Sequence, residues 1–372
     1  MTIGATASFF GPLVGAIAQR FHESIAIAGT SLSMYFVGGF VGVMIGWFIV
    51  QHLQGRVATI GGLLSLALGS GCVVVATHLH QWSLFCAATV VLGVGFGALD
   101  FSLNTILGRS AIEGRAQRLS FANAFWGVGS ILGPLLIAII HPQHFVTLFA
   151  IIAVASLLLS PLFRGLHAPA LRSAQHEQSL SPRPVLVTFI IAFILYVSVE
   201  MASSGWMATS LHSAGFSERT GAIVTASFWG ALTVGRMLGG RLHRHLSAQQ
   251  LVVSGLIAAI VLSLAATVHV VAPFAFVALG LAIANVYVFG IIWFQETVGT
   301  DNRGLSLIIV WTMAGGVLGP SATSFLVARG GLDTVPISIA LLSAATLVVF
   351  LSSRRFPAVS DSPTSPAPPA RH

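Results

Sequence analysis

Long apolar runs, separated by short polar segments, cover most of the chain. We count twelve runs, each close to the roughly 20 residues that cross a bilayer as a helix. They lie at 2–19, 27–51, 57–77, 82–108, 119–140, 145–163, 184–209, 220–241, 248–269, 272–295, 304–328 and 333–352. They lack the alternation of apolar and polar residues that is typical of membrane β-strands. The pattern therefore predicts an all-α polytopic membrane protein with twelve transmembrane helices.

The polar segments divide these helices into two groups of six. The longest polar segment, 164–183, contains two prolines and separates the two groups. We therefore predict an N-terminal six-helix bundle at 1–163, a cytoplasmic linker at 164–183 and a C-terminal six-helix bundle at 184–355. The Ser- and Pro-rich end, 356–372, is expected to be a disordered cytoplasmic tail.

The two groups share glycine motifs. Segment 42–53 has the glycine spacing and His-Leu ending of segment 235–246, and the Gly-Pro segment 129–134 matches 315–320. Such a parallel repeat predicts a 6+6 pseudo-symmetric fold, with the substrate site between the halves near the membrane midplane.

Composition and charge agree with this prediction. Only 7% of residues are charged, against about 25% in an ordinary soluble domain, and the mean hydropathy is +0.92. The net charge of +7 does not indicate a nucleic-acid partner, because the basic residues lie at helix ends. Thirteen arginines fall in one set of alternate loops and the tail, and three in the other set. By the positive-inside rule, both termini are cytoplasmic and the protein lies in the cell (inner) membrane.

Signatures of other functions are absent from the sequence. There is no P-loop, no zinc-protease or serine-hydrolase motif, and the two cysteines lie in apolar runs. We therefore expect a monomer that is not an enzyme and needs no metal or cofactor. We expect no cleavable signal peptide, since no basic segment or small-residue cleavage site comes before the first apolar run, which starts abruptly. Either the first helix is short or the true start lies upstream.

Two acidic residues interrupt the apolar runs. Asp100 lies in the fourth run and Glu200 in the seventh, at a similar place in the second half. An ionised side chain there costs roughly 2.5–3.5 kcal/mol on insertion scales, so such acids usually face a polar cavity on an ion or substrate path. Protonation neutralises a carboxylate that lacks a cation. We therefore predict proton coupling at both residues.

Other side chains in the runs are candidate ligands of a small-molecule substrate. Asn104 lies one helical turn from Asp100, and Ser203 lies three residues from Glu200 in a Ser-Ser-Gly segment that predicts a locally unwound helix. Trp offers a flat apolar face and one donor, which suits a sugar ring or an amphipathic drug. The remaining candidates, each of which packing also explains, are Asn123, Trp126, Trp206, Trp229, Asn285 and Trp311.

One arginine, Arg236, lies inside a run, about five residues from its expected cytoplasmic end. Its side chain either extends to the interface or pairs with an acid to latch the inner gate. The candidate partners of Arg236 are Glu113 and Glu296, and we expect the pair with Glu296.

These features resemble the major facilitator superfamily: twelve spans, a 6+6 repeat, cytoplasmic termini and the segment 235–241, Gly-Arg-Met-Leu-Gly-Gly-Arg. The family's matching loop after the second span is degraded, with Gly55 and Arg56 kept and His52 at the acidic position. The resemblance implies alternating access in the lipid bilayer.

Two segments also resemble the fucose/galactose/glucose:proton symporter group. Segment 97–104 is similar to that group's motif in the fourth span, with Asp100 at the acid, and segment 199–206 is similar to its seventh-span motif. The resemblance implies that Asp100 couples protons or substrate. Our first hypothesis is proton symport of a small solute such as a sugar. The alternative is proton-driven export of amphipathic drugs or metabolites, and a third class is a receptor or scaffold that does not transport.

Overall fold

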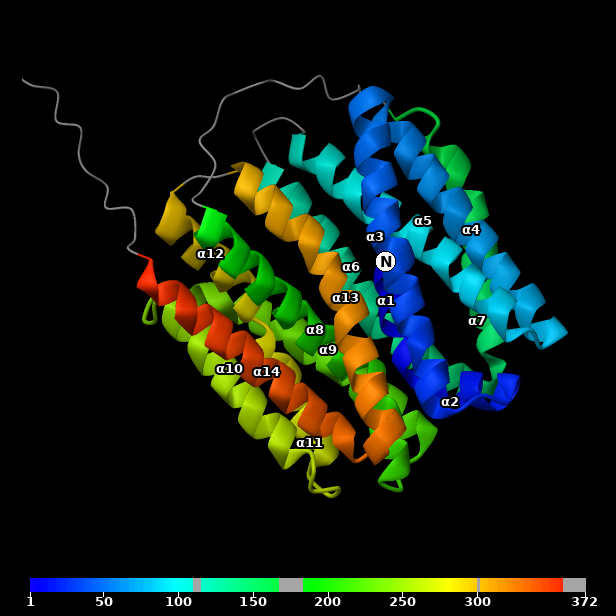
Figure 1. Cartoon of the computed structure of the whole chain (residues 1–372). Helices are drawn as coiled ribbons and strands as arrows, with labels where there is room; N and C mark the ends of the chain where they lie inside the picture. The colour runs from blue at the N-terminus through cyan, green and yellow to red at the C-terminus, as the bar shows by residue number, and fades with distance from the viewer. Residues whose placement is uncertain (110–114, 167–182, 300–301, 357–372) are drawn as a thin grey trace, which may run out of the picture.

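The computed structural model describes residues 1–109, 115–166, 183–299 and 302–356, and these residues are all-helical (Figure 1). Ten described segments are long and apolar enough to cross a membrane, and Ala124–Ile140 is a shorter apolar helix. The first half comprises α1 (Thr2–Ser8), α2 (Phe10–Phe21), α3 (Ile25–His52), α4 (Gly55–Leu79), α5 (Trp82–Arg109), α6 (Arg115–Ile140) and α7 (Phe145–Leu159). The second comprises α8 (Arg183–Ser213), α9 (Glu218–Leu242), α10 (Ala248–Ala265), α11 (Ala272–Ile283), α12 (Val286–Val298), α13 (Asn302–Gly330) and α14 (Thr334–Ser352). Short 3₁₀ turns, η1 (Pro142–His144), η2 (Ser160–Phe163) and η3 (Ser353–Arg355), extend some of them.

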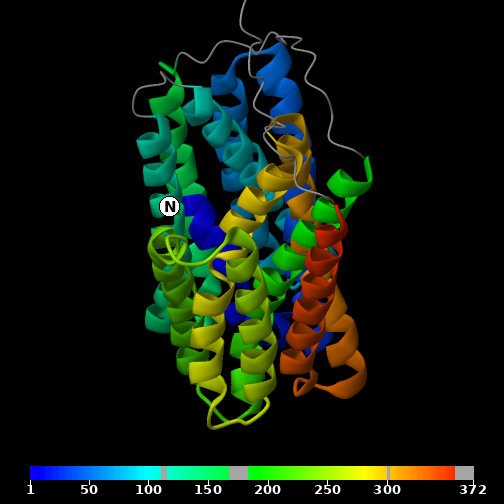
Figure 2. The same ribbon diagram turned by 90° about the vertical axis from the view of Figure 1, so that its left-hand side faces the viewer.

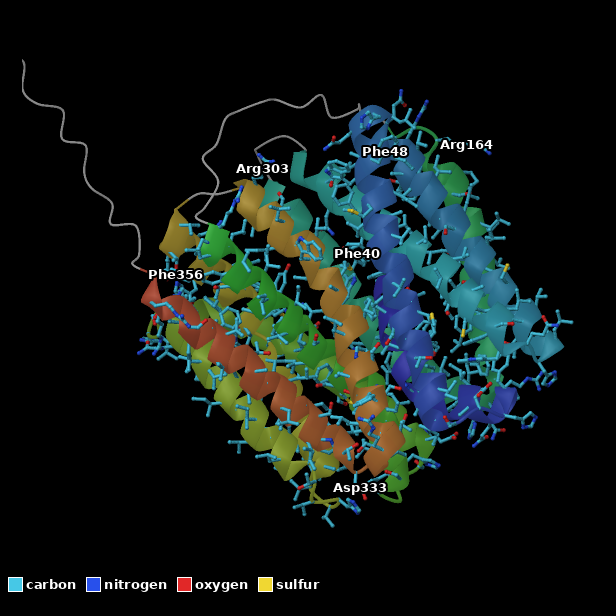
Figure 3. All side chains as sticks on the ribbon, in the orientation of Figure 1. Phe40, Phe48, Arg164, Arg303, Asp333 and Phe356 are labelled. Carbon is cyan, nitrogen blue, oxygen red and sulfur yellow. The ribbon has the colours of Figure 1, made fainter. Side chains whose placement is uncertain are left out.

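The two ends of the bundle differ in charge. Arg164 and Arg303 lie at one end and Asp333 at the other (Figure 3). We call the first the arginine-rich end, because Arg56, Arg164, Arg241 and Arg303 lie at helix ends there. The other is called the opposite end.

Local sequence explains where several helices begin and end. Ser24, Ser217 and Ser247 each accept a hydrogen bond from the backbone N–H three residues on, and so cap α3, α9 and α10. His22 and His80 adopt left-handed conformations after α2 and α4, which turns the chain at the opposite end.

Two predicted spans are broken, which corrects the expectation of continuous helices at 2–19 and 272–295. The first is divided at Phe9 into α1 and α2, and the other at Ala284–Asn285 into α11 and α12. At the second break, the Tyr196 hydroxyl of α8 donates a hydrogen bond to the Ile283 carbonyl at 3.3 Å. A side chain thus binds a carbonyl close to the helix end, as buried backbone in a membrane requires. The N-terminal residue of the chain, at the start of α1, lies well away from both ends of the bundle (Figure 1).

Glycines let α3 and α5 cross with their backbones in contact. A Cβ at Gly42 would meet the Val94 carbonyl, and a Cβ at Gly97 would meet the Gly39 carbonyl. Such contacts are typical of small-residue motifs between membrane helices. This packing fixes the part of α5 that precedes Asp100.

The two halves meet mainly through three helix pairs, α3 with α13, α6 with α9 and α2 with α8. The first pair lies side by side in Figure 1, and Figure 2 shows the bundle turned by 90°. Toward the opposite end, the Ser324 hydroxyl donates to the Ala26 carbonyl at 2.7 Å, and the Ser321 hydroxyl donates to Ser33 Oγ at 2.8 Å. These polar contacts hold the halves together at that end.

Candidate functional site

Asp100 lies in the last third of α5, about 14 Å along the helix from Arg109. Its carboxylate is half-buried and has one polar neighbour, because Asn104 Nδ2 lies 3.4 Å from Asp100 Oδ1 and donates to the Asp100 carbonyl at 2.8 Å. Among the described residues, no cation lies within 4.0 Å of this carboxylate. The predicted pair of Asp100 and Asn104 is therefore present, and the acid carries no fixed counter-charge there.

Asp100 lines a cavity of about 320 Å³. This volume lies within the range of small-molecule sites. Asp100, Asn104 and Thr2 contribute polar side chains, and most of the wall is apolar, with Trp126 as its largest side chain. This cavity is lined by residues of the first half: Met1, Thr2, Ile3, Leu63, Leu99, Asp100, Leu103, Asn104, Leu107, Phe125, Trp126, Leu159 and Phe163.

Glu200 has a different environment. It is 5% exposed in the middle of α8, and its Oε2 lies 3.6 Å from Nη2 of Arg236 on α9. Burial of an unpaired charge is expensive, so the two side chains stabilise each other in the apolar interior. The second acid is therefore held beside a permanent cation, unlike Asp100.

This pair corrects the predicted latch. The sequence left Arg236 either extending to the interface or pairing with Glu296 or Glu113, whereas the structure places it against Glu200 of the neighbouring helix α8. Glu296 is exposed near the end of α12, and Glu113 lies outside the described residues. The physical reason is that Glu200 is buried and only a third of the Arg236 side chain is exposed, so each charge is stabilised by the other.

Two predicted tryptophans meet across the halves. The rings of Trp126 on α6 and Trp229 on α9 lie 5.5 Å apart at 76°, an edge-on contact. Trp126 also lines the Asp100 cavity, and the buried Nε1 of Trp229 has no hydrogen-bond partner among the described residues. The pair therefore connects the wall of the Asp100 cavity with the second half.

Ser203 and Trp206 serve packing in this structure. The Ser203 hydroxyl donates to the Val199 carbonyl at 2.6 Å, and Trp206 Nε1 donates to the Pro320 carbonyl at 3.3 Å. Both are fully buried, and α8 is continuous through them. The predicted unwinding at Ser203–Gly205 is therefore wrong, because α8 is continuous there, Ser203 bonds within the helix and Gly205 makes room for Leu32 of α3.

The other predicted ligands are dispersed. Asn285 lies at the break between α11 and α12, where its buried Oδ1 has no described partner. Trp311 is 44% exposed on the same face of α13 as the exposed Leu318 and Phe325, so it lies away from the buried interior. The side chain of Asn123 is outside the described residues.

Tyr196 and Tyr287 are residues that the sequence analysis missed. Tyr196 lies one turn before Glu200 on α8 and is fully buried, and its ring centroid lies 6.0 Å from that of Tyr287 on α12. The spacing of four residues between Tyr196 and Glu200 could have identified the first of them.

A helical bundle with acids at mid-depth, one of them lining a cavity, defines a class of polytopic membrane transporters. The family model described as Major Facilitator Superfamily matches residues 1–305, and the chain belongs to this superfamily.

The chain is also similar to individual members. It is 27% identical over 261 residues to a glucose/galactose transporter of Brucella abortus, which covers 63% of this chain and 62% of that protein. The matched region thus spans less than two thirds of this curated relative. The fold matches the transporter FucP in its outward conformation with a TM-score of 0.61 at 18% identity, covering 94% and 97% of the two chains. It matches a D-xylose-proton symporter with a TM-score of 0.72 at 14% identity, covering 95% and 96%.

Proposed function

We propose that this protein is a proton-coupled secondary transporter that imports a small neutral solute of the sugar type by alternating access. The observation that carries the proposal is the difference between the two acids. Asp100 lines a cavity and has no cation within 4.0 Å among the described residues, whereas Glu200 is paired with Arg236. The printed names of its relatives, a glucose/galactose transporter and a D-xylose-proton symporter, support the solute class.

The proposed mechanism uses Asp100 as the proton carrier. Its deprotonated form places one uncompensated negative charge in the apolar interior, and its protonated form removes it. Moving one charge through the whole membrane field is worth about 2.3 kcal/mol per 100 mV, so protonation changes which orientation of the carrier is favoured. Asn104 and Trp126 line the same cavity and would contact the solute, while Glu200 would hold Arg236 in place.

The proposal includes a topology. Twelve spans in two six-helix bundles, 1–163 and 184–355, would rock about the contacts between the halves, joined by the linker 164–183. The arginine distribution supports an inner-membrane protein with a cytoplasmic arginine-rich end, cytoplasmic termini and a cytoplasmic tail at 356–372. A monomer suffices for this mechanism, with protons and the small solute as its partners.

A second candidate function is proton-driven export of amphipathic compounds. It is favoured by the apolar wall around Asp100, where leucines, phenylalanines and Trp126 outnumber the polar side chains. The same acid would then exchange a proton for the exported compound. Direction of flux under an imposed proton gradient separates the two functions.

The test is sugar uptake into proteoliposomes that contain the purified protein. An inward proton gradient should drive accumulation of labelled glucose or galactose, and Asp100→Asn should abolish the dependence on the gradient while the protein still inserts. Asp333→Asn is the matched control, because Asp333 is exposed at the opposite end. Gradient-driven accumulation that survives Asp100→Asn would rule out this residue as the proton carrier.

A further inference from the structure

A second cavity lies at the opposite end, between the halves. Its volume is about 500 Å³, and its walls come from α2 of the first half and from α8 and the start of α9 of the second. It lies beyond close contacts of α2 and α3 with α8, where Gly11 meets the Ser204 carbonyl and Gly29 meets the Trp206 ring. The Asp100 cavity shares no lining residue with it. We call this second cavity the outer cleft.

We propose that the outer cleft is a second binding site, which holds a neutral polyhydroxylated solute before the halves open at this end. This inference rests on the proposed function, since it assigns the same solute class to a site that the transport mechanism does not require. Its polar side chains come from both halves: Gln19, Glu23, Thr209, His212, Ser213 and Glu218.

The chemistry of the lining favours this class of ligand. Carboxylates accept hydrogen bonds and an amide both donates and accepts, so Glu23, Glu218 and Gln19 together match the vicinal hydroxyls of a sugar. Among the described residues, two carboxylates and no arginine line the cleft, which disfavours an anionic solute. The remaining wall is apolar, with Pro12, Ile25 and Leu332 among its residues, as is usual for small-molecule sites.

Thr209 adds a hydroxyl group to the cleft wall. The residue is 5% exposed on α8 and lines the cleft. A hydroxyl both donates and accepts hydrogen bonds, so a solute hydroxyl in the cleft would have a partner there.

Gly15 provides empty space on the facing wall. No heavy atom lies within 4 Å of the position that a Cβ would take at Gly15, and the residue lines the cleft. Glu218 of this cleft lies 3.9 Å from His141 of the first half, so its carboxylate is within reach of both halves. A solute bound here would therefore lie where the halves separate.

The first experiment removes one hydroxyl without changing volume. Labelled glucose or galactose uptake is measured in intact cells that have no other uptake route. We expect Thr209→Val to raise the KM about three- to tenfold, the effect of one lost hydrogen bond, with the maximal rate within twofold of the parent. Thr209→Ser keeps the hydroxyl and should restore the KM, which a purely structural role of the methyl group would not predict.

The second experiment fills the cleft. Gly15→Leu should raise the KM at least as much as Thr209→Val. Gly61→Leu is its control, since Gly61 also has no heavy atom within 4 Å of a Cβ but lies exposed on α4. If the parent takes up sugar and both Thr209→Val and Gly15→Leu leave the KM unchanged, the outer cleft is not a binding site and the transport function stands. If the parent takes up no sugar, the proposed function fails and this inference fails with it.

Discussion

Asp100 and Glu200 differ in what stands beside each carboxylate. Asp100 has the amide of Asn104 at 3.4 Å, and Glu200 has the guanidinium of Arg236 at 3.6 Å. An amide donor does not neutralise charge, whereas a guanidinium stays charged at all physiological pH values. In the proposed mechanism, Asp100 is therefore the residue that carries the proton.

The buried pair of Glu200 and Arg236 predicts a specific pattern of stability. Removing one partner leaves the other charge uncompensated, so Glu200→Gln and Arg236→Gln should each lower the free energy of unfolding. About 1–3 kcal/mol is expected, since a third of the Arg236 side chain is exposed and solvent weakens the effect. The double variant should recover most of the loss. Thermal unfolding of the purified protein in detergent measures all three, and strictly additive losses would show that the two side chains do not interact.

The sequence shows which single residues are unusual better than it shows which side chains they contact. Asp100 and Asn104 are found together because a spacing of four on a helix places them on one face. Glu200 and Arg236 were both recognised as unusual, but their pairing depends on how α8 and α9 are rotated against each other. The 44% exposure of Trp311 depends on the rotation of α13 in the same way, since an apolar run with little amphipathicity does not show which face is buried.

For whole helices, the apolar runs predict well where each helix lies along the chain, but they do not predict where a helix is broken. Ranges such as 27–51 and 57–77 overlap α3 and α4 closely. The break at Phe9 has a local marker, because Pro12 has no backbone N–H to donate to the Ser8 carbonyl, whereas the break at Ala284–Asn285 carries no proline or glycine. The second is accompanied by a hydrogen bond from Tyr196 on another helix, a tertiary contact that sequence periodicity does not contain.

The crossing of α3 and α5 predicts opposite effects for two glycines. Gly97→Ala forces a methyl group into the backbone of α3, and should lower the free energy of unfolding by about 2 kcal/mol or more. Gly61→Ala meets open space on α4, and should leave stability unchanged or raise it by up to about 1 kcal/mol, since alanine favours helix. Thermal unfolding again compares them. Equal effects would mean that the α3–α5 contact is looser than the structure shows.

For the whole molecule, the described polar contacts between the halves gather toward one end. Along α3 and α13, Ser324 bonds to Ala26 and Ser321 to Ser33, while farther along the pair Phe40 and Trp311 are in ring contact at 6.0 Å. The halves are thus joined by hydrogen bonds at the opposite end. If alternating access operates, these bonds must break each time that end opens.

A disulfide between α3 and α13 should therefore stop transport. In a protein with Cys72 and Cys86 replaced by Ala, Ser33→Cys and Ser321→Cys are combined, because their hydroxyl oxygens lie 2.8 Å apart. A disulfide bond of about 2.05 Å requires only a small further approach. Oxidation with a membrane-permeant reagent should reduce sugar uptake at least tenfold, and reduction should restore it.

The control joins two helices that belong to the same half. Thr323 on α13 and Ser338 on α14 also have hydroxyl oxygens 2.8 Å apart, and Thr323→Cys with Ser338→Cys creates a disulfide that does not cross between the halves. If the halves move as bodies, this second disulfide leaves uptake nearly unchanged. If both disulfides stop uptake, the second half must deform internally during transport. If neither does, the seam between α3 and α13 stays closed throughout the cycle, and the solute passes by a route that does not separate these helices.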